Sequence, residues 1–242
     1  VIDSDVRVPG FTFAAVGEVP SGLVVSRNDP EHLFVVSRGS SDIQVLDIAD
    51  FRRGTGIEGQ AFSGLLPDGA RPSDMVLSPD EDALIVALPL TGQLARIPIL
   101  GDGELGGAEL LSLRAEVPAP RDLTALAPEQ RPTGYRVTCP RDLDPFAPPV
   151  TAPREPVSRG PATEPWDLLV DPATERVLVA DRALPVIHVV EPTELDEEAP
   201  LSVSVPTRAL ALTPFVPSEP LTPGGALPPA TERFLYAIDE LE

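Results

Sequence analysis

A short phrase headed by proline returns five times along the chain, and its spacing constrains the fold more than any single residue does. Successive copies lie 52, 48, 45 and 41 residues apart, starting at Pro20, Pro72, Pro120, Pro165 and Pro206. A period of this length is typical of one four-stranded antiparallel blade of a β-propeller. The sequence therefore predicts an all-β chain, a β-propeller with about five blades visible.

The three best copies each contain three strand candidates separated by turn residues. The unit that starts at Pro72 reads PSDMVLSPDEDALIVALPLTGQLARIPI, with apolar runs at 75–77, 83–87 and 94–99. Its second run is nearly unbroken in apolar residues, which is typical of a strand that is covered on both faces. A fourth, outer strand is expected before the next proline, at 60–66, 109–115 and 201–205.

The copies at Pro120 and Pro206 are interrupted by proline-rich insertions, at residues 131–165 and 214–230. The chain also stops after the second strand of a blade and begins with what reads as an outer strand. Five inner strands fit a five-bladed ring or part of a larger one, and the ragged ends favour the larger ring. We therefore expect one propeller domain over residues 1–242, truncated at both ends and belonging to a ring of about six to eight blades.

The phrase over residues 72–99 is a proline, two residues, an apolar run, Ser-Pro-Asp, an apolar strand, a turn and another apolar strand. It resembles the YVTN-type and lactonase-like β-propeller repeat. Glu81 stands where that family usually has glycine, and the Tyr-Val-Thr-Asn signature itself is absent. Lactonase-like relatives depend on His, Arg and Glu or on metal sites that contain Asn, whereas this chain has one asparagine, Asn28. The resemblance thus implies the fold and argues against transferring the activity.

The charge balance limits the classes of partner. The chain has 38 acidic and 18 basic residues, a net charge of −20, and all of its basic residues are arginine. Such a surface repels phosphate backbones and anionic membranes, so we expect no nucleic-acid partner. No apolar run approaches the ~18 residues of a membrane span, so we expect no transmembrane segment. Because the repeat family is often exported in bacteria, the resemblance implies a periplasmic or cell-surface location.

Carboxylates recur at one position of the repeat. Two residues after the opening proline, three copies carry Asp74, Asp122 and Asp167, and two others carry Gly22 and Arg208. If this position begins the innermost strand, the carboxylates gather near the central channel and form a candidate site for a divalent cation such as calcium. The alternative is that each aspartate caps its turn by accepting backbone N–H bonds.

Trp166 and Arg208 form a candidate ligand-binding pair. Trp166 is the sole tryptophan and follows Pro165, so an exposed indole at the channel mouth could stack on a sugar or an aromatic ligand. Its alternative role is to cover a neighbouring loop. The chain has two histidines, His32 and His188, which limits general-base and metal chemistry, and we expect His188 to be structural.

These observations predict an exported, non-enzymatic propeller that acts as a scaffold for a protein partner or a small ligand, as a component of a larger assembly. The chain has few residues of the types that act as catalytic groups, which favours this function. The alternative is a lactonase-like, metal-dependent hydrolase that uses Asp74, Asp122 and Asp167.

Overall fold

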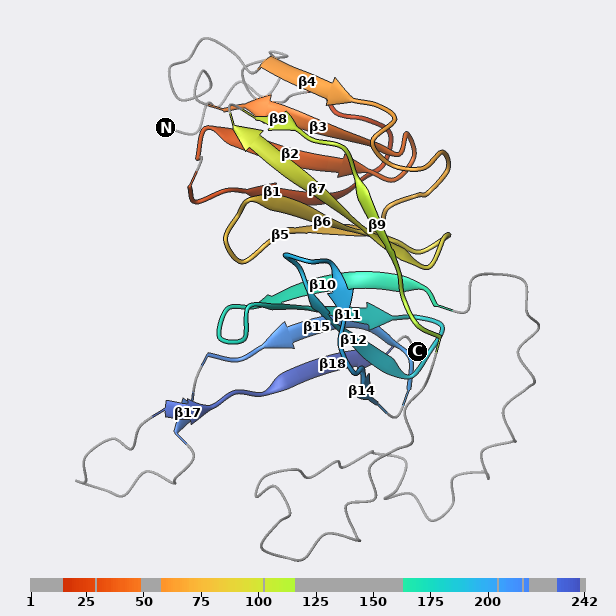
Figure 1. Cartoon of the computed structure of the whole chain (residues 1–242), viewed down its shortest axis with the longest axis vertical. Coiled ribbons are helices and arrows are strands. Elements are labelled where there is room, and N and C mark those ends of the chain that lie inside the picture. The colour runs from red at the N-terminus through yellow and green to blue at the C-terminus, as the bar shows by residue number, and fades with distance from the viewer. Residues whose placement is uncertain are drawn as a thin grey trace, which may run out of the picture.

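The computed structural model describes residues 15–28, 30–48, 58–101, 103–115, 163–203, 205–214, 216–217 and 230–239. Within these residues every regular element is a β-strand, and all of the strand pairs are antiparallel (Figure 1). The all-β prediction is therefore confirmed. The copy at Pro120, with Asp122, and most of the 131–165 insertion lie outside the described residues. The described residues contain no helix that could cross a membrane.

The first blade is a four-stranded meander. Its order is β1 (Pro20–Val25), β2 (His32–Ser37), β3 (Asp42–Asp47) and β4 (Glu58–Phe62). The three predicted strands and the outer fourth strand are all present, because each apolar run is long enough for one strand and the intervening turns are short.

The second and third blades repeat this order with one variation at the outer edge. There, two short strands share the fourth position, and both pair with the third strand of the blade. The second blade consists of β5 (Asp74–Leu77), β6 (Ala83–Leu88), β7 (Gln93–Gly101), β8 (Glu104–Leu105) and β9 (Glu109–Ser112). The third consists of β10 (Pro165–Asp171), β11 (Arg176–Asp181), β12 (Val186–Glu191), β13 (Asp196–Glu197) and β14 (Leu201–Ser202).

The fourth sheet pairs β15 (Thr207–Leu212) with β18 (Leu235–Asp239). Between them, β16 (Val216–Pro217) and β17 (Ala230–Glu232) form a short ladder at the base of the predicted 214–230 insertion. Residues 218–229 lie outside the described residues.

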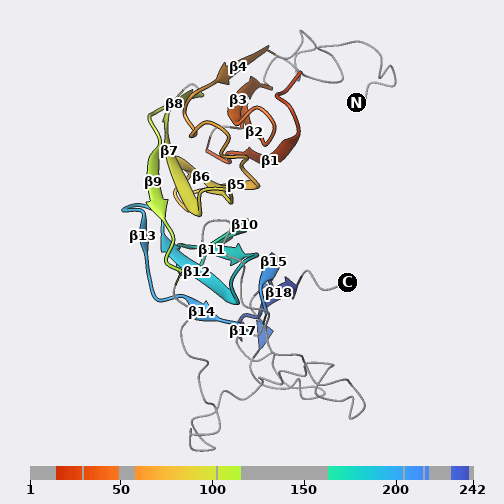
Figure 2. The same ribbon diagram turned by 90° about the vertical axis from the view of Figure 1, so that its right-hand side faces the viewer.

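The inner strands β1, β5, β10 and β15 lie in series, each in contact with the next. Figure 2 shows them along one side of the molecule, which we call the hub, with the outer strands β4, β9, β13 and β14 on the other side. The blade headed by Pro72 contacts the blade headed by Pro165 directly, through β5 and β10. Among the described residues no sheet lies between these two blades, and the count of about five blades stays a prediction.

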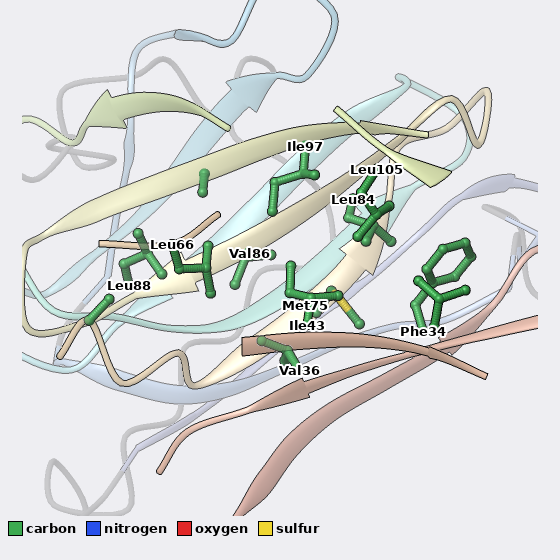
Figure 3. Packing of buried hydrophobic residues seen from close by; sticks show 13 residues of the cluster. Phe34, Val36, Ile43, Leu66, Met75, Leu84, Val86, Leu88, Ile97 and Leu105 are labelled. Carbon is green, nitrogen blue, oxygen red and sulfur yellow. The ribbon is translucent and has the colours of Figure 1, made fainter. Parts of the chain in front are cut away.

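The core lies between the blades, and β6 shows why. All six of its residues are buried. Because side chains alternate along a strand, Leu84, Val86 and Leu88 pack toward the first blade, whereas Ile85 and Ala87 pack toward the third. Figure 3 shows the cluster between the first two blades, where Phe34 and Met75 face each other across the contact. The unbroken apolar run in the sequence is explained by these two covered faces.

The blades approach each other closely at Gly22. A Cβ atom at this position would lie 2.9 Å from the backbone nitrogen of Met75 in the next blade and 3.0 Å from Cγ1 of Val36. A backbone atom cannot move aside as a flexible side chain can. Glycine at this position therefore permits the packing of the first blade on the second.

We predict that Gly22→Ala lowers the free energy of unfolding by about 1 to 3 kcal/mol, because the added methyl group overpacks this contact. Gly107→Ala is the matched control, since a Cβ there meets nothing within 4 Å. Urea denaturation of both variants measures the difference, and equal stabilities would contradict the prediction.

Candidate functional site at the hub

The inner strands begin with the same irregularity. β1, β10 and β15 each carry one extra residue relative to their partner strand near their start. Such a bulge re-aims side chains away from the regular alternation of the strand. The hydroxyl groups of Ser21 and Ser73, next to the opening prolines, donate to the backbone carbonyls of Pro72 (2.9 Å) and Pro165 (3.2 Å) of the following blade.

Asp74 and Asp167 make a second set of links between blades. Oδ2 of Asp74 accepts a hydrogen bond from the backbone N–H of Leu168 at 2.9 Å, and Oδ2 of Asp167 accepts one from Leu210 at 2.7 Å. The alternative prediction for these aspartates was that each accepts backbone N–H bonds and so caps its own turn. Both do accept backbone N–H bonds, but the N–H groups belong to the neighbouring blade.

The structure also brings Asp74 and Asp167 together, close enough for their carboxyl groups to share a hydrogen bond. Burial raises the pKa of Asp74 to about 6, and the neighbouring Asp167 carboxyl adds to the rise. Burial also raises the pKa of Asp167, while the hydrogen bonds that it accepts from Leu210 and Asp74 oppose this effect. Of the two carboxyl groups, Asp74 is therefore the one favoured to carry the proton and to donate it to Asp167.

The third predicted metal ligand, Asp122, lies outside the described residues. Within the part of the chain that the structure describes, no three His, Cys, Asp or Glu side chains come together as metal ligands would. In each of the two aspartates that do meet, one carboxylate oxygen already accepts a hydrogen bond from a backbone N–H group. The divalent-cation site stays a prediction.

The strand register moves Arg208 out of the aspartate position. The N–H group of Leu210 binds Asp167 as that of Leu168 binds Asp74, so Leu210 is the counterpart of Leu168. Counting back, Ala209 corresponds to Asp167, and Arg208 corresponds to Trp166. The alignment on Pro206 is therefore displaced by one residue. The exposed Arg208 occupies the fourth blade's version of the tryptophan position.

Trp166 lies under two guanidinium groups. Cζ of Arg182 is 4.0 Å from the centroid of the indole ring, and Cζ of Arg38 is 4.7 Å from it. Arg182 follows β11 in the same blade, whereas Arg38 follows β2 in the first blade, two blades away. Arg182 also lies 3.7 Å from the Glu164 carboxylate. Each cation–π contact is worth about 0.5 to 2 kcal/mol, depending on how far it is desolvated. Trp166 thus joins blades that are not neighbours.

A buried ionic triad lies between the third strand and the outer edge of the third blade. His188 is fully buried, with Nδ1 at 2.7 Å from Glu197 and Nε2 at 3.0 Å from Asp181. Burial lowers the pKa of His188, but the hydrogen bonds to Asp181 and Glu197 outweigh it and raise the pKa overall. When the ring is protonated, it can donate a hydrogen bond from each nitrogen. Glu197 also accepts the backbone N–H of Arg114 at 2.7 Å, from the tail of the second blade. His188 is structural, as predicted.

Neither this triad nor the pair of arginines over Trp166 was predicted from the sequence. The apolar neighbours of His188 on β12 were visible in the sequence, but nothing there indicated the two carboxylates, which come from the ends of two other strands, β11 and β13. Arg38 and Arg182 do occupy equivalent positions after a second strand. That repeat was visible in the alignment of the copies at Pro20 and Pro165.

Comparison with known proteins supports the fold and leaves the activity open. No protein-family model matches the sequence, and no curated protein does. Among solved structures, a protein from Lactobacillus plantarum superposes with a TM-score of 0.51 at 15% identity, over 81% of this chain and 45% of that chain. A candidate 6-phosphogluconolactonase from Bacteroides uniformis gives 0.51 at 11% identity, over 81% and 44%. Virginiamycin B lyase from Staphylococcus aureus gives 0.49 at 13% identity, over 83% and 47%.

The chain thus spans less than half of the length of the structures that it matches. Its antiparallel four- and five-stranded sheets and the two likenesses with a TM-score of 0.51 make it a β-propeller by fold. The YVTN repeat family itself is not confirmed.

The Asp74 carboxyl makes the stability depend on pH. Its folded-state pKa of about 6 lies above the ordinary value of 3.8, so the folded chain binds this proton more tightly than the unfolded chain does. Folding therefore loses stability as the pH rises through this interval, by at most about 3 kcal/mol.

We predict that Asp74→Asn removes this loss, because the amide keeps an acceptor for Leu168 and a donor for Asp167. The variant should be more stable than the natural chain at pH 7, by about 1 to 2 kcal/mol, and the difference should shrink toward pH 4. Asp74→Ala is the control and should be less stable at every pH, because it leaves the N–H of Leu168 without its acceptor. Chemical denaturation between pH 4 and pH 8 tests both, and a parallel pH profile for Asp74→Asn would refute the pKa assignment.

We predict that His188→Leu lowers the free energy of unfolding by about 3 to 5 kcal/mol at pH 6, because two buried carboxylates lose their cation. The pKa of His188 is raised by folding, so its stabilisation is complete below pH 6.5 and is lost as the pH rises through the folded-state value. The cost of the substitution should therefore fall at alkaline pH. His32→Leu, at the chain's other histidine, should cost at most about 1 kcal/mol. Urea titrations at pH 6 and at alkaline pH measure the cost of each substitution. A cost of His188→Leu that does not change with pH would rule out an imidazolium.

Proposed function

We propose that the chain is a binding module, a portion of a non-enzymatic β-propeller that takes an anionic group of a ligand or partner protein at the hub, beside Trp166. Export to the periplasm or cell surface is part of this proposal, because the repeat family that the sequence resembles is often exported.

The observation that carries the proposal is the convergence of Arg38 and Arg182 on one indole. In a chain with a net charge of −20, two guanidinium groups from separate blades meet at one place. Among the described residues, the side chain of Arg38 contacts Trp166 and forms no ion pair. A guanidinium group offers a fork of donors that suits a carboxylate or a phosphate. The ring beneath it holds the fork in place.

We predict that a small carboxylate such as citrate, or inorganic phosphate, changes the fluorescence of Trp166 in a saturable titration. Since Trp166 is the sole tryptophan, the signal comes from this site alone. Arg38→Gln should weaken binding by about tenfold, the loss of about 1.4 kcal/mol of a charged hydrogen bond. Arg176→Gln is the control, because Arg176 pairs with Glu198 away from the site, at 2.6 Å.

A titration that gives no saturable signal with either anion, or an Arg38→Gln variant that binds as the natural chain does, would contradict the proposal.

The paired carboxyls of Asp74 and Asp167 favour one second function, a metal-dependent hydrolase of the lactonase-like class. Calorimetric titration with calcium, followed by a lactone-hydrolysis assay, separates the two functions. Calcium binding together with turnover that Asp167→Asn abolishes would replace the binding module with the enzyme.

A further inference from the structure

The His188 triad also holds the backbone of segments outside its own strand. Oδ1 of Asp181 accepts hydrogen bonds from the N–H groups of Ala183 and Leu184, at 2.7 and 2.8 Å. Oδ2 of Asp181 accepts one from the N–H group of Glu164 at 3.1 Å, and it lies 3.0 Å from Nε2 of His188. One carboxylate oxygen therefore contacts both the buried imidazole and the residue that leads into β10.

Glu164 and Asp181 stand beside the two partners of a cation–π contact. Asp181 directly precedes Arg182, and Glu164 is two residues before Trp166. The backbone N–H group of Arg182 donates to the carbonyl of Glu164 at 3.0 Å, and its guanidinium group lies 3.7 Å from the Glu164 carboxylate. Cζ of the same guanidinium group is 4.0 Å from the centroid of the indole ring. The hydrogen bond between Asp181 and Glu164 thus helps to hold the guanidinium group over the indole.

The charge of His188 decides which hydrogen bonds the triad can make. The charged groups that face the ring are Asp181 on β11 and Glu197 on β13, with Arg114 beyond Glu197 at the tail of the second blade. Burial lowers the pKa of His188, but the hydrogen bonds to the two carboxylates outweigh it and raise the pKa above its ordinary value of 6.5. A neutral ring has one N–H group and one lone pair, so one of the two carboxylates then faces an acceptor.

Asp181 is the carboxylate that loses its donor when the ring is neutral. Three backbone N–H groups stabilise the charge of Asp181, whereas one, from Arg114, stabilises that of Glu197. The remaining proton is therefore better placed on Nδ1, which lies 2.7 Å from Glu197. The lone pair of Nε2 then faces Oδ2 of Asp181, and the two acceptors repel each other. This oxygen is the one that binds Glu164.

We propose that His188 is a pH switch for the anion site beside Trp166, in which the protonated ring holds Arg182 over the indole and the neutral ring releases it. The signal passes through the shared oxygen of Asp181 and the contacts of Glu164 with Arg182. As regulation of anion binding, this inference rests on the proposed function. The movement of Arg182 does not, because it needs no ligand.

Acrylamide quenching of Trp166 fluorescence in the ligand-free chain tests the movement of Arg182, since Trp166 is the sole tryptophan. Quenching should rise in one step as the pH increases, because the released guanidinium group uncovers the ring. The midpoint should lie above pH 6.5 and coincide with the titration of the His188 ring followed by NMR. Circular dichroism over the same pH range checks that the chain stays folded. A flat quenching profile, or a step at a different midpoint, would overturn the proposal.

Substitutions identify the titrating group. His188→Gln should abolish the step, and glutamine suits this position because the pairing of β2 with β3 places Gln44 at the equivalent position of the first blade. His32→Gln, at the chain's other histidine, is the matched control and should keep the step. Arg182→Gln should give the high quenching of the released state at every pH. A step that persists in His188→Gln but disappears in Asp74→Asn would assign it to the Asp74 carboxyl, whose pKa is about 6, and would overturn the proposal.

Sulfate is the probe for the anion site, because its charge does not change over this pH range. Its dissociation constant should rise by up to about tenfold as the pH passes the midpoint, the effect of losing one charged hydrogen bond. His188→Gln should remove this dependence on pH. Because the coupling is reciprocal, saturating sulfate should raise the midpoint of the quenching step by up to about one pH unit.

The two measurements separate this inference from the proposed function. Sulfate binding with the same affinity at every pH, together with a flat quenching profile, would overturn the switch and leave the binding module standing. A quenching step at the His188 midpoint without any sulfate binding would support the movement of Arg182 and contradict the binding module.

Discussion

The structure depends on the contact between each inner strand and the blade before it. A sheet with apolar side chains on both faces exposes too much hydrophobic surface to be stable alone, and burying a leucine-sized side chain contributes about 1.5 to 3 kcal/mol. Each described blade therefore owes its stability to its neighbours. The strands of the second blade, with a fully buried β6 between two apolar clusters, show this dependence most clearly.

The polar links are arranged around these clusters at different distances from the hub. Between the second and third blades, Asp74 binds Leu168 at the inner strands, and Glu197 binds the N–H group of Arg114 near the outer edge. Between the first and second blades, Glu81 accepts three hydrogen bonds from the turn at 26–28. Glu81 has a φ of 61°, a backbone conformation that favours glycine and is strained for other residues. The three hydrogen bonds of its side chain offset this strain. Asp74, Asp167, Glu81 and Glu197 thus each link one blade to the next.

Much of the fold could be predicted from the sequence, because the repeat period and the apolar runs are local signals. The predicted runs at 75–77, 83–87 and 94–99 fall within β5, β6 and β7. The partners of the aspartates could not be predicted, since Asp74 binds a residue 94 positions away and hydrogen bonding across blades leaves no local pattern. The one-residue displacement at Pro206 has a similar cause. A bulge changes the register without changing the composition, so an alignment on proline cannot detect it.

The contact of Arg38 with Trp166 has a mechanical consequence. It joins the first blade to the third and bypasses the second, so it acts as a chord across the arc of sheets. The length of a chord sets the curvature of its arc. A change that breaks the contact of Arg38 with the indole would lengthen this chord and alter the tilt between the first and third blades. The spacing of the two ends of the arc therefore depends on one contact at the hub.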